Sequence, residues 1–435
     1  MRASRAKMMT AIPSSSGQPR PGSAQVGLIT NLFGIGDGIF EGGAERHLLH
    51  LAQAMRDRGI GAIVYQPSPR STDYVIDGVP VCARPVDRRG LWRSLARRAI
   101  ADGVTNLHFQ YLEHVPLGLG APGGRAVPVT ATQHGVHWDI PYEPHGRDWY
   151  RGHELARLYL PAYRAQQLTR SLLALRRTRA VAAMDTSFLR VVQALAPSLR
   201  GRLYPTAPFS DLVPEEGTVE ASFESLLPQV SEAVRAARAQ GGCVVLVPRN
   251  LSLVRGESWL PLIASQVAEQ IPALFIVTGQ FMGHLGHQVR AQRLAFSDAD
   301  GGVGERLKIL HLDGVQRQVM SRLYSACDVV LVPTFAHEGA SLAAAEAMAF
   351  GKAIVTSNVG GLNDTVDDHW TGLVARAEVG SLARAVILLA REPVLRARLG
   401  SQARAKASAC FTMAAWSRAQ RPFFEAAGWV YDHDE

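Results

Sequence analysis

The sequence predicts an α/β protein made of two doubly wound, Rossmann-like domains. Apolar, strand-like runs alternate with helix-like segments along the chain, which is typical of parallel sheets with helical crossovers. A proline-rich stretch, residues 205–217, divides these runs into two sets. With 435 residues and 47% hydrophobic content, the chain can build more than one core. Because ligands bind at the carboxyl ends of strands in such folds, we expect the two domains to face a shared cleft.

Each expected strand is a short apolar run bounded by turn residues or by a helical segment. In the first half the expected strands are residues 25–30, 61–65, 79–83, 104–109, 126–132, 180–184 and 202–204. In the second half they are residues 243–247, 273–277, 307–311, 328–332, 352–356 and 371–374.

The domain boundaries follow from composition. Residues 1–23 are rich in Ser, Pro, Gly and Arg without an apolar core segment, which predicts a disordered leader. We expect a first domain over 24–210 and a second over 211–410, whose linker and added helix occupy 211–241. The last segment, 411–435, is expected to be a C-terminal helix that crosses back to the first domain, anchored by Trp416, Phe423 and Phe424.

The charge balance favours anionic small molecules as partners. The chain has 46 basic and 38 acidic residues, a formal net charge of +8. This basic excess suits nucleotide diphosphates, anionic lipid headgroups or acidic glycans. We expect no nucleic-acid binding, because the sequence has no RNP-like, KH-like or zinc-finger pattern; a basic surface that binds nucleic acid is the competing hypothesis.

Cysteine usage and hydropathy indicate a cytoplasmic protein. Cys82, Cys243 and Cys327 lie in or beside apolar runs and are expected core residues. No C-x-x-C pair is present, which favours a reducing compartment, and no apolar stretch reaches 18 residues. We therefore expect a cytoplasmic location, either free or peripheral on the inner face of the membrane.

One segment could touch a membrane. Residues 87–98 form a basic amphipathic helix candidate with an apolar stripe of Leu91, Trp92, Leu95 and Ala99. Such a helix can lie on an anionic membrane. In the alternative, the stripe packs into the core and the arginines are solvated.

The segment 338–351 carries the most specific pattern. Glu338 and Glu346 are eight positions apart, and the helix expected over 341–350 ends at Gly351, a residue suited to the left-handed cap. One carboxylate then lies just before a helix N-terminus and the other lies within the helix. The free N–H groups of the first turn can bind phosphate. This combination suits a sugar nucleotide.

Residues 338–361 resemble the E-x7-E signature of the retaining glycosyltransferases of family 4, which have the GT-B fold. The resemblance continues through 368–374, with Ala340 and Ser341 in place of Phe and Gly. It implies that Glu338 lies near the transferred sugar and is essential, and that Glu346 binds the ribose hydroxyls. It also implies backbone-dominated donor contacts from Gly339, Ala340, Ser341 and Leu342.

Three further elements are similar to parts of that family, in the same order along the chain. Gly42-Gly43, between a strand and a helix, is similar to its glycine-rich first loop for acceptor and phosphate. His134-Gly135 is similar to its active-site histidine, although a lone histidine after a strand is often structural. Arg249-Asn250 and Arg255-Gly256 resemble its phosphate-binding element.

The phosphate-binding element departs from the family's spacing. Counting back from Arg255 places Asn250, not Arg249, at the family's arginine position. Arg249 either reaches the phosphate from one residue earlier or makes a weaker contact. The alternative for both arginines is an ordinary place on the surface.

The predicted function is transfer of a sugar, with retention, from a nucleotide-sugar to a hydroxyl of a glycan or lipid-linked glycan, in envelope or exopolysaccharide synthesis. Glu338, His134 and Arg255 are the expected catalytic residues. We expect no cofactor and no essential metal, since the D-x-D-like pairs at 298–300 and 432–434 are read as solvated. An aromatic cluster within 137–150 could stack on an acceptor or pack its own loop. The alternative function is a non-catalytic relative that binds nucleotide sugars or glycans as a regulatory subunit.

Overall fold

The computed structural model divides the chain into two compact units. Unit 1 comprises Met1–His134, Pro161–Thr206 and Ser417–Glu435, and unit 2 comprises Gly135–Leu160 and Ala207–Trp416. The structure describes residues 24–31, 42–86, 90–118, 127–135, 156–212, 214, 228–250, 253–279, 306–312, 315–336 and 338–429.

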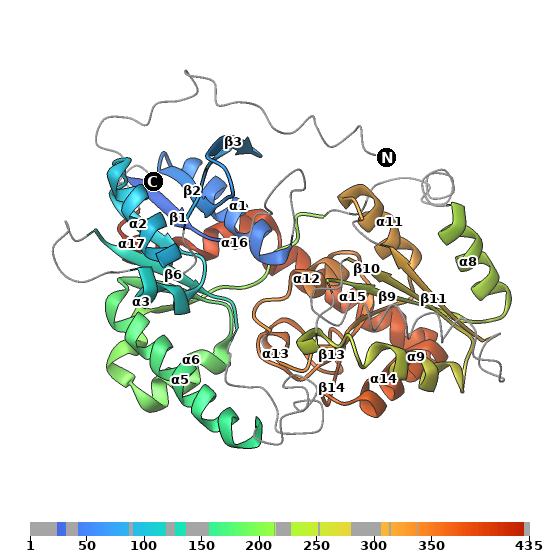
Figure 1. Cartoon of the computed structure of the whole chain (residues 1–435). Helices are drawn as coiled ribbons and strands as arrows, with labels where there is room; N and C mark the ends of the chain where they lie inside the picture. The colour runs from blue at the N-terminus through green and yellow to red at the C-terminus, as the bar shows by residue number, and fades with distance from the viewer. Residues whose placement is uncertain are drawn as a thin grey trace. The chain divides into compact units, whose positions relative to one another are not determined.

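Unit 1 contains an eight-stranded sheet in the order β3-β4-β2-β1-β5-β6-β7-β8 (Figure 1). All neighbouring strands are parallel except β3 and β4. The strands are β1 (Gln25–Ile29), β2 (Gly61–Pro67), β3 (Thr72–Ile76), β4 (Val79–Arg84), β5 (Asn106–Phe109), β6 (Val129–Gln133), β7 (Ala180–Ala183) and β8 (Leu203–Pro205).

The chain runs from β1 outward to β2 and β4, then returns to β5 and continues outward on the other side through β6, β7 and β8. Right-handed crossovers in opposite directions place helices on opposite faces, so this sheet is doubly wound with its switch point between β1 and β5. The helices are α1 (Gly43–Arg56), α2 (Leu91–Ala101), α3 (Val115–Gly118), α5 (Ala156–Arg177), α6 (Thr186–Leu195) and α17 (Arg421–Ala427), with 3-10 turns η3 (Leu112–His114) and η4 (Pro197–Arg202).

Unit 2 contains a six-stranded parallel sheet in the order β11-β10-β9-β12-β13-β14. Its switch point lies between β9 and β12. The strands are β9 (Cys243–Pro248), β10 (Ala273–Thr278), β11 (Leu307–Leu312), β12 (Val329–Val332), β13 (Ala353–Ser357) and β14 (Leu373–Ala375). The helices are α8 (Pro228–Ala239), α9 (Leu260–Ala268), α11 (Arg317–Ala326), α12 (Leu342–Ala349), α13 (Leu362–Thr365), α14 (Val379–Arg391), α15 (Pro393–Cys410) and α16 (Met413–Ala419), with the 3-10 turn η5 (Leu253–Arg255).

All the expected strands are present, with ends that differ by at most three residues, and one strand was not expected. β3 pairs antiparallel with β4 at the edge of the first sheet. The turn between them is Asp77-Gly78, and both residues have positive φ, 47° and 79°. An Asp-Gly pair with this geometry is the preferred two-residue hairpin turn, so the signal for β3 was in the sequence.

The C-terminal segment 411–435, where one helix was expected, forms two. α16 and α17 are separated at Gln420, and the division between the units falls at Ser417. Trp416 is buried in unit 2 against Phe209, whereas Phe423 is buried in unit 1. In Figure 1, α17, drawn in red, accordingly lies among the blue elements of unit 1.

The division of the chain falls at Thr206, close to the boundary expected at 210. The structure describes the helix expected within 211–241 from Pro228 onward. Residues 1–23, the aromatic cluster of 137–150 and the acidic pairs at 298–300 and 432–434 lie outside the described residues.

The apolar stripe of α2 packs into the core of unit 1. Leu95 and Ala99 are fully buried, and Trp92 stacks on the imidazole of His114 with ring centroids 3.7 Å apart. Arg98 pairs with Asp102 at the end of the helix. The contacts therefore favour the core interpretation of this stripe over the membrane one. No described helix is both long and apolar enough to span a membrane.

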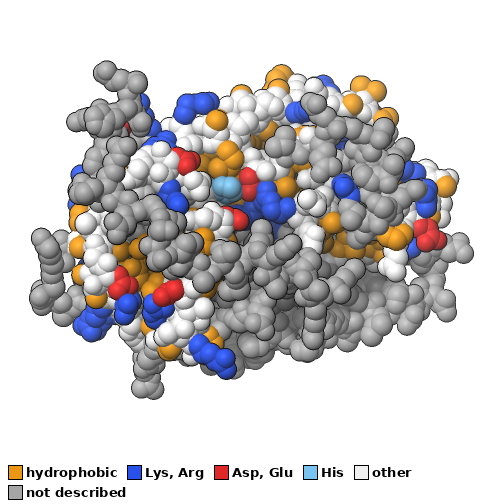
Figure 2. All heavy atoms as spheres, turned by 90° about the horizontal axis from the view of Figure 1, so that it is seen from above, with side chains coloured by type: hydrophobic (Ala, Val, Ile, Leu, Met, Phe, Trp, Pro, Cys, Tyr) orange, Lys and Arg blue, Asp and Glu red, His pale blue; other side chains and the backbone are white. Residues whose placement is uncertain are grey.

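The three cysteines expected in the core are buried. Cys82, Cys243 and Cys327 are buried and Cys410 is exposed, all as free thiols. Burial raises the pKa of the Cys243 and Cys327 thiols to about 12, so both stay protonated. On the face drawn in Figure 2, the described Lys and Arg side chains form separate groups among hydrophobic and neutral ones.

Candidate active site

In unit 2, the predicted donor-binding residues lie at the switch point of the sheet. Arg249 directly follows β9, and Thr334 and Glu338 follow β12, its neighbour across the switch point. Both strands are parallel and end at the same edge. Open α/β sheets bind their ligands at this position.

A buried ion pair links the two strand ends. Arg249 Nη2 donates to Glu338 Oε2 at 2.7 Å, and the side chains are only 7% and 10% exposed. Thr334 Oγ1 donates to the same oxygen at 3.1 Å and accepts a hydrogen bond from Arg249 Nη1. Within the described residues, Glu338 Oε1 makes no hydrogen bond, so this oxygen keeps its capacity for a ligand hydroxyl.

The charges keep Glu338 ionised. Burial opposes ionisation, but the positive charges of Arg249 and Arg255 and the hydrogen bonds from Arg249 and Thr334 outweigh it, so the pKa of Glu338 lies below its ordinary value. Burial lowers the pKa of Arg249, while the charge of Glu338 opposes that shift. The guanidinium group is so strongly basic that Arg249 stays protonated at neutral pH despite this shift.

Close backbone packing holds Arg255 beside this pair. Gly256 has φ +84°, and a Cβ there would lie 2.0 Å from the Pro333 carbonyl oxygen. Only glycine fits such an approach. The Phe335 N–H also donates to the Val254 carbonyl at 2.9 Å. These contacts join η5 to the segment after β12, so the positive charge of Arg255 acts on Glu338.

Asn250 faces a different neighbour from Arg249. A Cβ at Gly279, which has φ +84° after β10, would lie 2.5 Å from Asn250 Oδ1. The Asn250 side chain is therefore packed against β10, while Arg249 contacts the β12 side. Of these two residues, the structure brings Arg249 and not Asn250 to Glu338.

The helix α12 follows as expected, and Gly351 after it has φ +64°. Gly339 is buried in the loop, and Ala340 and Leu342 are partly exposed. Ser341 is the N-cap residue, and its carbonyl accepts the first helical hydrogen bond, from Ala345. A backbone hydrogen bond also fixes this loop, because the Gly361 N–H donates to the Glu338 carbonyl at 3.0 Å.

Glu346 is buried inside α12, at 4% exposure. The Tyr324 hydroxyl, from α11, donates to Glu346 Oε2 at 2.8 Å. The partner that a buried acid requires is therefore present. Tyr324 also stacks on Phe350, with ring centroids 5.2 Å apart, which fixes the position of its hydroxyl.

In unit 1, the remaining predicted residues also meet at a switch point. Gly42 is the N-cap residue of α1, Gly43 is its first residue, and His134 directly follows β6. Gln110, which follows β5, donates from Nε2 to the Ala44 carbonyl at 2.8 Å and lies 2.8 Å from His134 Nε2. One side chain thus connects the first turn of α1 to the histidine.

Aromatic rings surround His134. The ring of His47 lies edge-on with centroids 5.3 Å apart, and that of Tyr111 lies at 5.1 Å. Burial lowers the pKa of His134 to about 3, so the imidazole is neutral at physiological pH. Burial, together with the charges of His134 and other histidines, also holds the pKa of His47 well below its ordinary value.

Sequence reasoning missed Thr334, Tyr324 and Gln110. Tyr324 and Gln110 acquire their roles through Glu346 and His134, which are 22 and 24 positions away. Thr334 contacts Glu338 only four positions along the chain, just before the E-x7-E pattern begins. Across the residues that the structure describes, no group of three or more His, Cys, Asp or Glu side chains could hold a metal ion.

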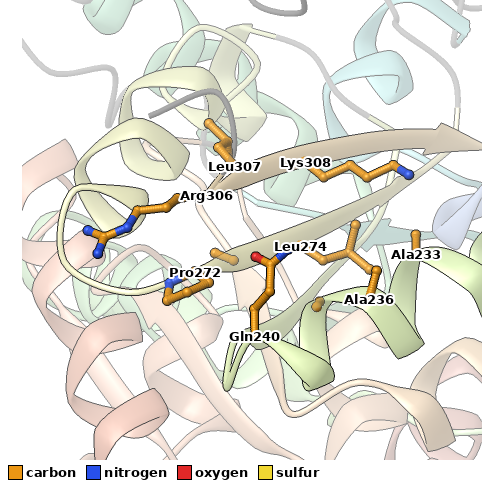
Figure 3. A pocket seen from close by; sticks show the side chains of 10 residues that line it. Ala233, Ala236, Gln240, Pro272, Leu274, Arg306, Leu307 and Lys308 are labelled. Atoms are coloured by element: carbon orange, nitrogen blue, oxygen red, sulfur yellow. The ribbon is translucent and has the colours of Figure 1, made fainter. Parts of the chain in front are cut away.

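A separate groove of about 170 Å³ lies elsewhere in unit 2 (Figure 3). Gln240 of α8 and Pro272, Leu274 and Leu307 line it, while Arg306 and Lys308 extend to opposite sides. Pro272 and Arg306 directly precede β10 and β11, so the groove lies at the amino ends of these strands. The switch-point site is at the opposite, carboxyl edge.

Part of unit 2 is similar to a known protein family. The family described as "Glycosyl transferases group 1" matches residues 273–406. The D-inositol 3-phosphate glycosyltransferase of Mycobacteroides abscessus is 34% identical over 116 residues, 26% of this chain and 25% of that protein. The corresponding protein of Nocardia farcinica is 33% identical over 134 residues, 31% of this chain and 29% of that protein. The matches therefore span under a third of these relatives' length.

Solved structures share the whole fold at low identity. Sucrose-phosphate synthase from Thermosynechococcus elongatus has a TM-score of 0.69 at 17% identity, covering 92% of this chain and 98% of that one. Anabaena HepE in complex with UDP-glucose has a TM-score of 0.66 at 16% identity, covering 92% and 99%. WaaG, a glycosyltransferase of lipopolysaccharide biosynthesis, has a TM-score of 0.63 at 15% identity, covering 93% and 100%.

The matched segment contains both glutamates of the E-x7-E pattern, whereas Arg249, Arg255 and most of unit 1 precede it. Residues 273–406 are therefore similar to the group 1 glycosyl transferases, and the chain has the GT-B fold.

Proposed function

We propose that this protein is a glycosyltransferase that moves a sugar from a nucleotide diphosphate donor to a hydroxyl acceptor. The observation that carries the proposal is the buried Arg249–Glu338 pair at the switch point between β9 and β12. A carboxylate with one uncommitted oxygen can bind a sugar hydroxyl. Adjacent permanent positive charge can bind the diphosphate.

The donor fits the residues around this pair. Arg249 and Arg255 would stabilise the departing phosphate, on which negative charge accumulates during transfer. The free N–H groups at the start of α12, with backbone contacts from Gly339 to Leu342, would hold the diphosphate. Glu346, oriented by the Tyr324 hydroxyl, would accept hydrogen bonds from the ribose. Asn250 is proposed at the edge of this site.

The proposed reaction retains the anomeric configuration, as in the family 4 enzymes that the E-x7-E pattern resembles. The acceptor hydroxyl attacks the sugar from the face that the phosphate leaves, and the leaving phosphate takes the proton. Glu338 binds the sugar and no protein nucleophile is assigned. Gly42, Gly43 and His134 would contribute from unit 1, the glycines by letting backbone approach the acceptor or the donor phosphate closely.

The proposed reaction needs no metal ion. Two arginines and the helix N-terminus supply the positive charge that a divalent cation would otherwise bring to the diphosphate. Donor turnover should therefore be unchanged in excess EDTA. Loss of turnover that added Mg²⁺ or Mn²⁺ restores would refute this part of the proposal.

We propose a glycan or a lipid-linked glycan as the acceptor, in envelope or exopolysaccharide synthesis. The similarity to WaaG, whose title places it in lipopolysaccharide biosynthesis, and the family resemblance support this. A cytoplasmic location with peripheral contact to anionic membrane would use exposed arginines such as Arg93 and Arg97 on α2. Flotation with anionic and neutral vesicles tests this: equal binding to both kinds, or binding to neither, would exclude it.

The deciding experiment is donor hydrolysis by the purified full chain across UDP-, GDP- and ADP-sugars, beginning with UDP-glucose. Glu338→Gln should lower release of the preferred nucleotide by about 10²-fold, and Arg255→Ala by about tenfold or more. Arg190→Ala, which removes an exposed arginine from α6 in the other unit, should match the wild type. Proton NMR of the first product formed with an acceptor shows whether the anomeric configuration is retained.

Release that is equally fast in Glu338→Gln would contradict the assigned site. No release from any donor, together with no thermal shift by any nucleotide, would contradict the proposed function.

A further inference from the structure

The side chain of Gln110 lies between the first turn of α1 and His134. It is fully buried, and its Nε2 lies 2.8 Å from both the Ala44 carbonyl oxygen and His134 Nε2. The three residues follow β5, β1 and β6, which are neighbours in the sheet around its switch point. The contact is therefore built into the strand order of unit 1.

The Ala44 carbonyl fixes the orientation of the Gln110 amide. A carbonyl oxygen only accepts hydrogen bonds, so the atom that faces it must be the NH₂ group. The reversed amide would place two oxygens 2.8 Å apart. The second hydrogen of the NH₂ group then points to His134.

This orientation determines the tautomer of His134. An amide nitrogen does not accept hydrogen bonds, so His134 Nε2 must be the acceptor and must carry a lone pair. A neutral imidazole with an accepting Nε2 has its proton on Nδ1. Burial keeps the ring neutral, since it lowers the pKa of His134 to about 3.

The geometry leaves the Nδ1–H group available to a ligand. His47 and Tyr111 contact the ring through their aromatic faces and edges, at centroid distances of 5.3 and 5.1 Å. Among the described residues, Nδ1 has no hydrogen-bond partner, and His134 is partly exposed. The ring therefore presents one oriented donor.

We propose that Gln110 is a positioning residue that holds His134 as the Nδ1–H tautomer, so that His134 donates a neutral hydrogen bond to a hydroxyl or phosphate oxygen of a bound ligand. The tautomer follows from the contacts alone, whereas the ligand role rests on the proposed function. A neutral donor recognises an oxygen without adding charge. His134 then orients the substrate and carries no proton during transfer.

The first test is nitrogen NMR of the full chain with ¹⁵N-labelled histidine. The chain has 14 histidines, and His134→Asn identifies the signals of His134 by their loss. The wild type should show the Nδ1–H pattern. Gln110→Leu should abolish that preference, and Gln110→Glu should reverse it, because a carboxylate accepts from Nε2–H.

Gln66→Leu is the matched control for loss of a buried glutamine. Gln66 lies on β2 of the same sheet, is 2% exposed, and donates from Nε2 to the Tyr74 hydroxyl at 2.8 Å. This variant should leave the His134 signals unchanged. An Nε2–H pattern in the wild type, or an unchanged pattern in Gln110→Leu, would overturn the proposal. Circular dichroism of each variant verifies folding.

The second test measures donor turnover. Gln110→Leu should lower kcat about tenfold with a change in donor KM below about threefold, while Gln66→Leu matches the wild type. Unchanged kcat in a Gln110→Leu protein that has lost the tautomer would refute the ligand role. If the wild type turns over no donor, the proposed function fails and the NMR result still decides the tautomer.

Discussion

Acid should destabilise unit 1 through His108. This histidine is completely buried on β5, where Thr130 Oγ1 lies 3.0 Å from Nδ1 and Thr132 Oγ1 lies 3.1 Å from Nε2. Phe423 and Trp429 pack against its ring at centroid distances of 6.2 and 5.8 Å. Burial, with a smaller contribution from His134, lowers the pKa of His108 from 6.5 to about 3.

The sign of the effect follows from the direction of this shift. Between the folded and unfolded pKa values the unfolded chain binds more protons, so the free energy of unfolding falls as pH falls from about 6.5 towards 3. Between pH 7 and pH 5, His108 alone should lower it by about 2 kcal/mol. Other buried histidines add to the total loss.

The assay is urea unfolding of the full chain at pH 7 and pH 5, followed by circular dichroism and tryptophan fluorescence. His108→Gln keeps a polar side chain of similar reach without an ionisable ring, and should lose about 2 kcal/mol less than the wild type between the two pH values. Leu95→Ala, a core truncation on α2, should lower stability by about 2–5 kcal/mol at both. Equal pH dependence in His108→Gln and the wild type would refute the reasoning.

Three more predictions concern unit 2. Arg249→Met should lower the free energy of unfolding by about 3–5 kcal/mol at pH 7, because it leaves Glu338 buried and unpaired. Adding Glu338→Gln should restore most of the lost stability. If the effects of the two substitutions on urea unfolding were strictly additive, the pairing would be contradicted. Gly256→Ala should lower it by about 2 kcal/mol or more, since φ is +84° and the Pro333 carbonyl occupies the space of the Cβ; an unchanged melting temperature would show that the loop relaxes. Thr334→Val should lower the free energy of unfolding by about 1–3 kcal/mol, because the hydrogen bond to Glu338 is lost. Thr334→Ser is the control that retains this bond. Equal melting temperatures of the two variants would argue against the bond.

The strands could be predicted because each is a continuous apolar run, as expected for parallel sheets covered on both faces. The edge strand β3 begins with the polar residues Thr72 and Asp73 and has only three apolar residues after them, so a search for longer apolar runs passes over it. Only the Asp77-Gly78 turn indicated this strand, because an Asp-Gly pair favours a two-residue hairpin. The rest of the sequence predicted parallel strands, which gave no reason to look for a hairpin. Local turn chemistry was the more informative signal at this edge.

The positions of the site residues were also accessible from sequence. Glu338, Arg249 and His134 each follow a predicted strand, and in a doubly wound sheet the strand ends adjoin the ligand site. The contacts that these residues make in the folded protein could not be predicted from the sequence. Whether Arg249 or Asn250 faces Glu338 depends on the direction in which the chain leaves β9, and the close approach of Asn250 to Gly279 decides it.

The two switch points share a design that only the structure reveals. In unit 2, Arg249 and Thr334 hold the Glu338 carboxylate from strands on both sides of the switch point. In unit 1, Gln110 holds the His134 ring and binds the Ala44 carbonyl from across the other switch point.

In each unit, a side chain predicted to bind the ligand is thus held by a polar residue that is not itself part of a sequence motif. These residues are Thr334 in unit 2 and Gln110 in unit 1. Such partners act only through the residue they hold. Removing the partner and the held residue together should therefore change activity no more than removing the held residue alone, which is strong non-additivity. A partner that also bound the ligand directly would add its own loss. Double-mutant cycles on donor turnover, with Gln110→Leu and His134→Asn in unit 1 and Thr334→Val and Glu338→Gln in unit 2, distinguish these two cases at each switch point.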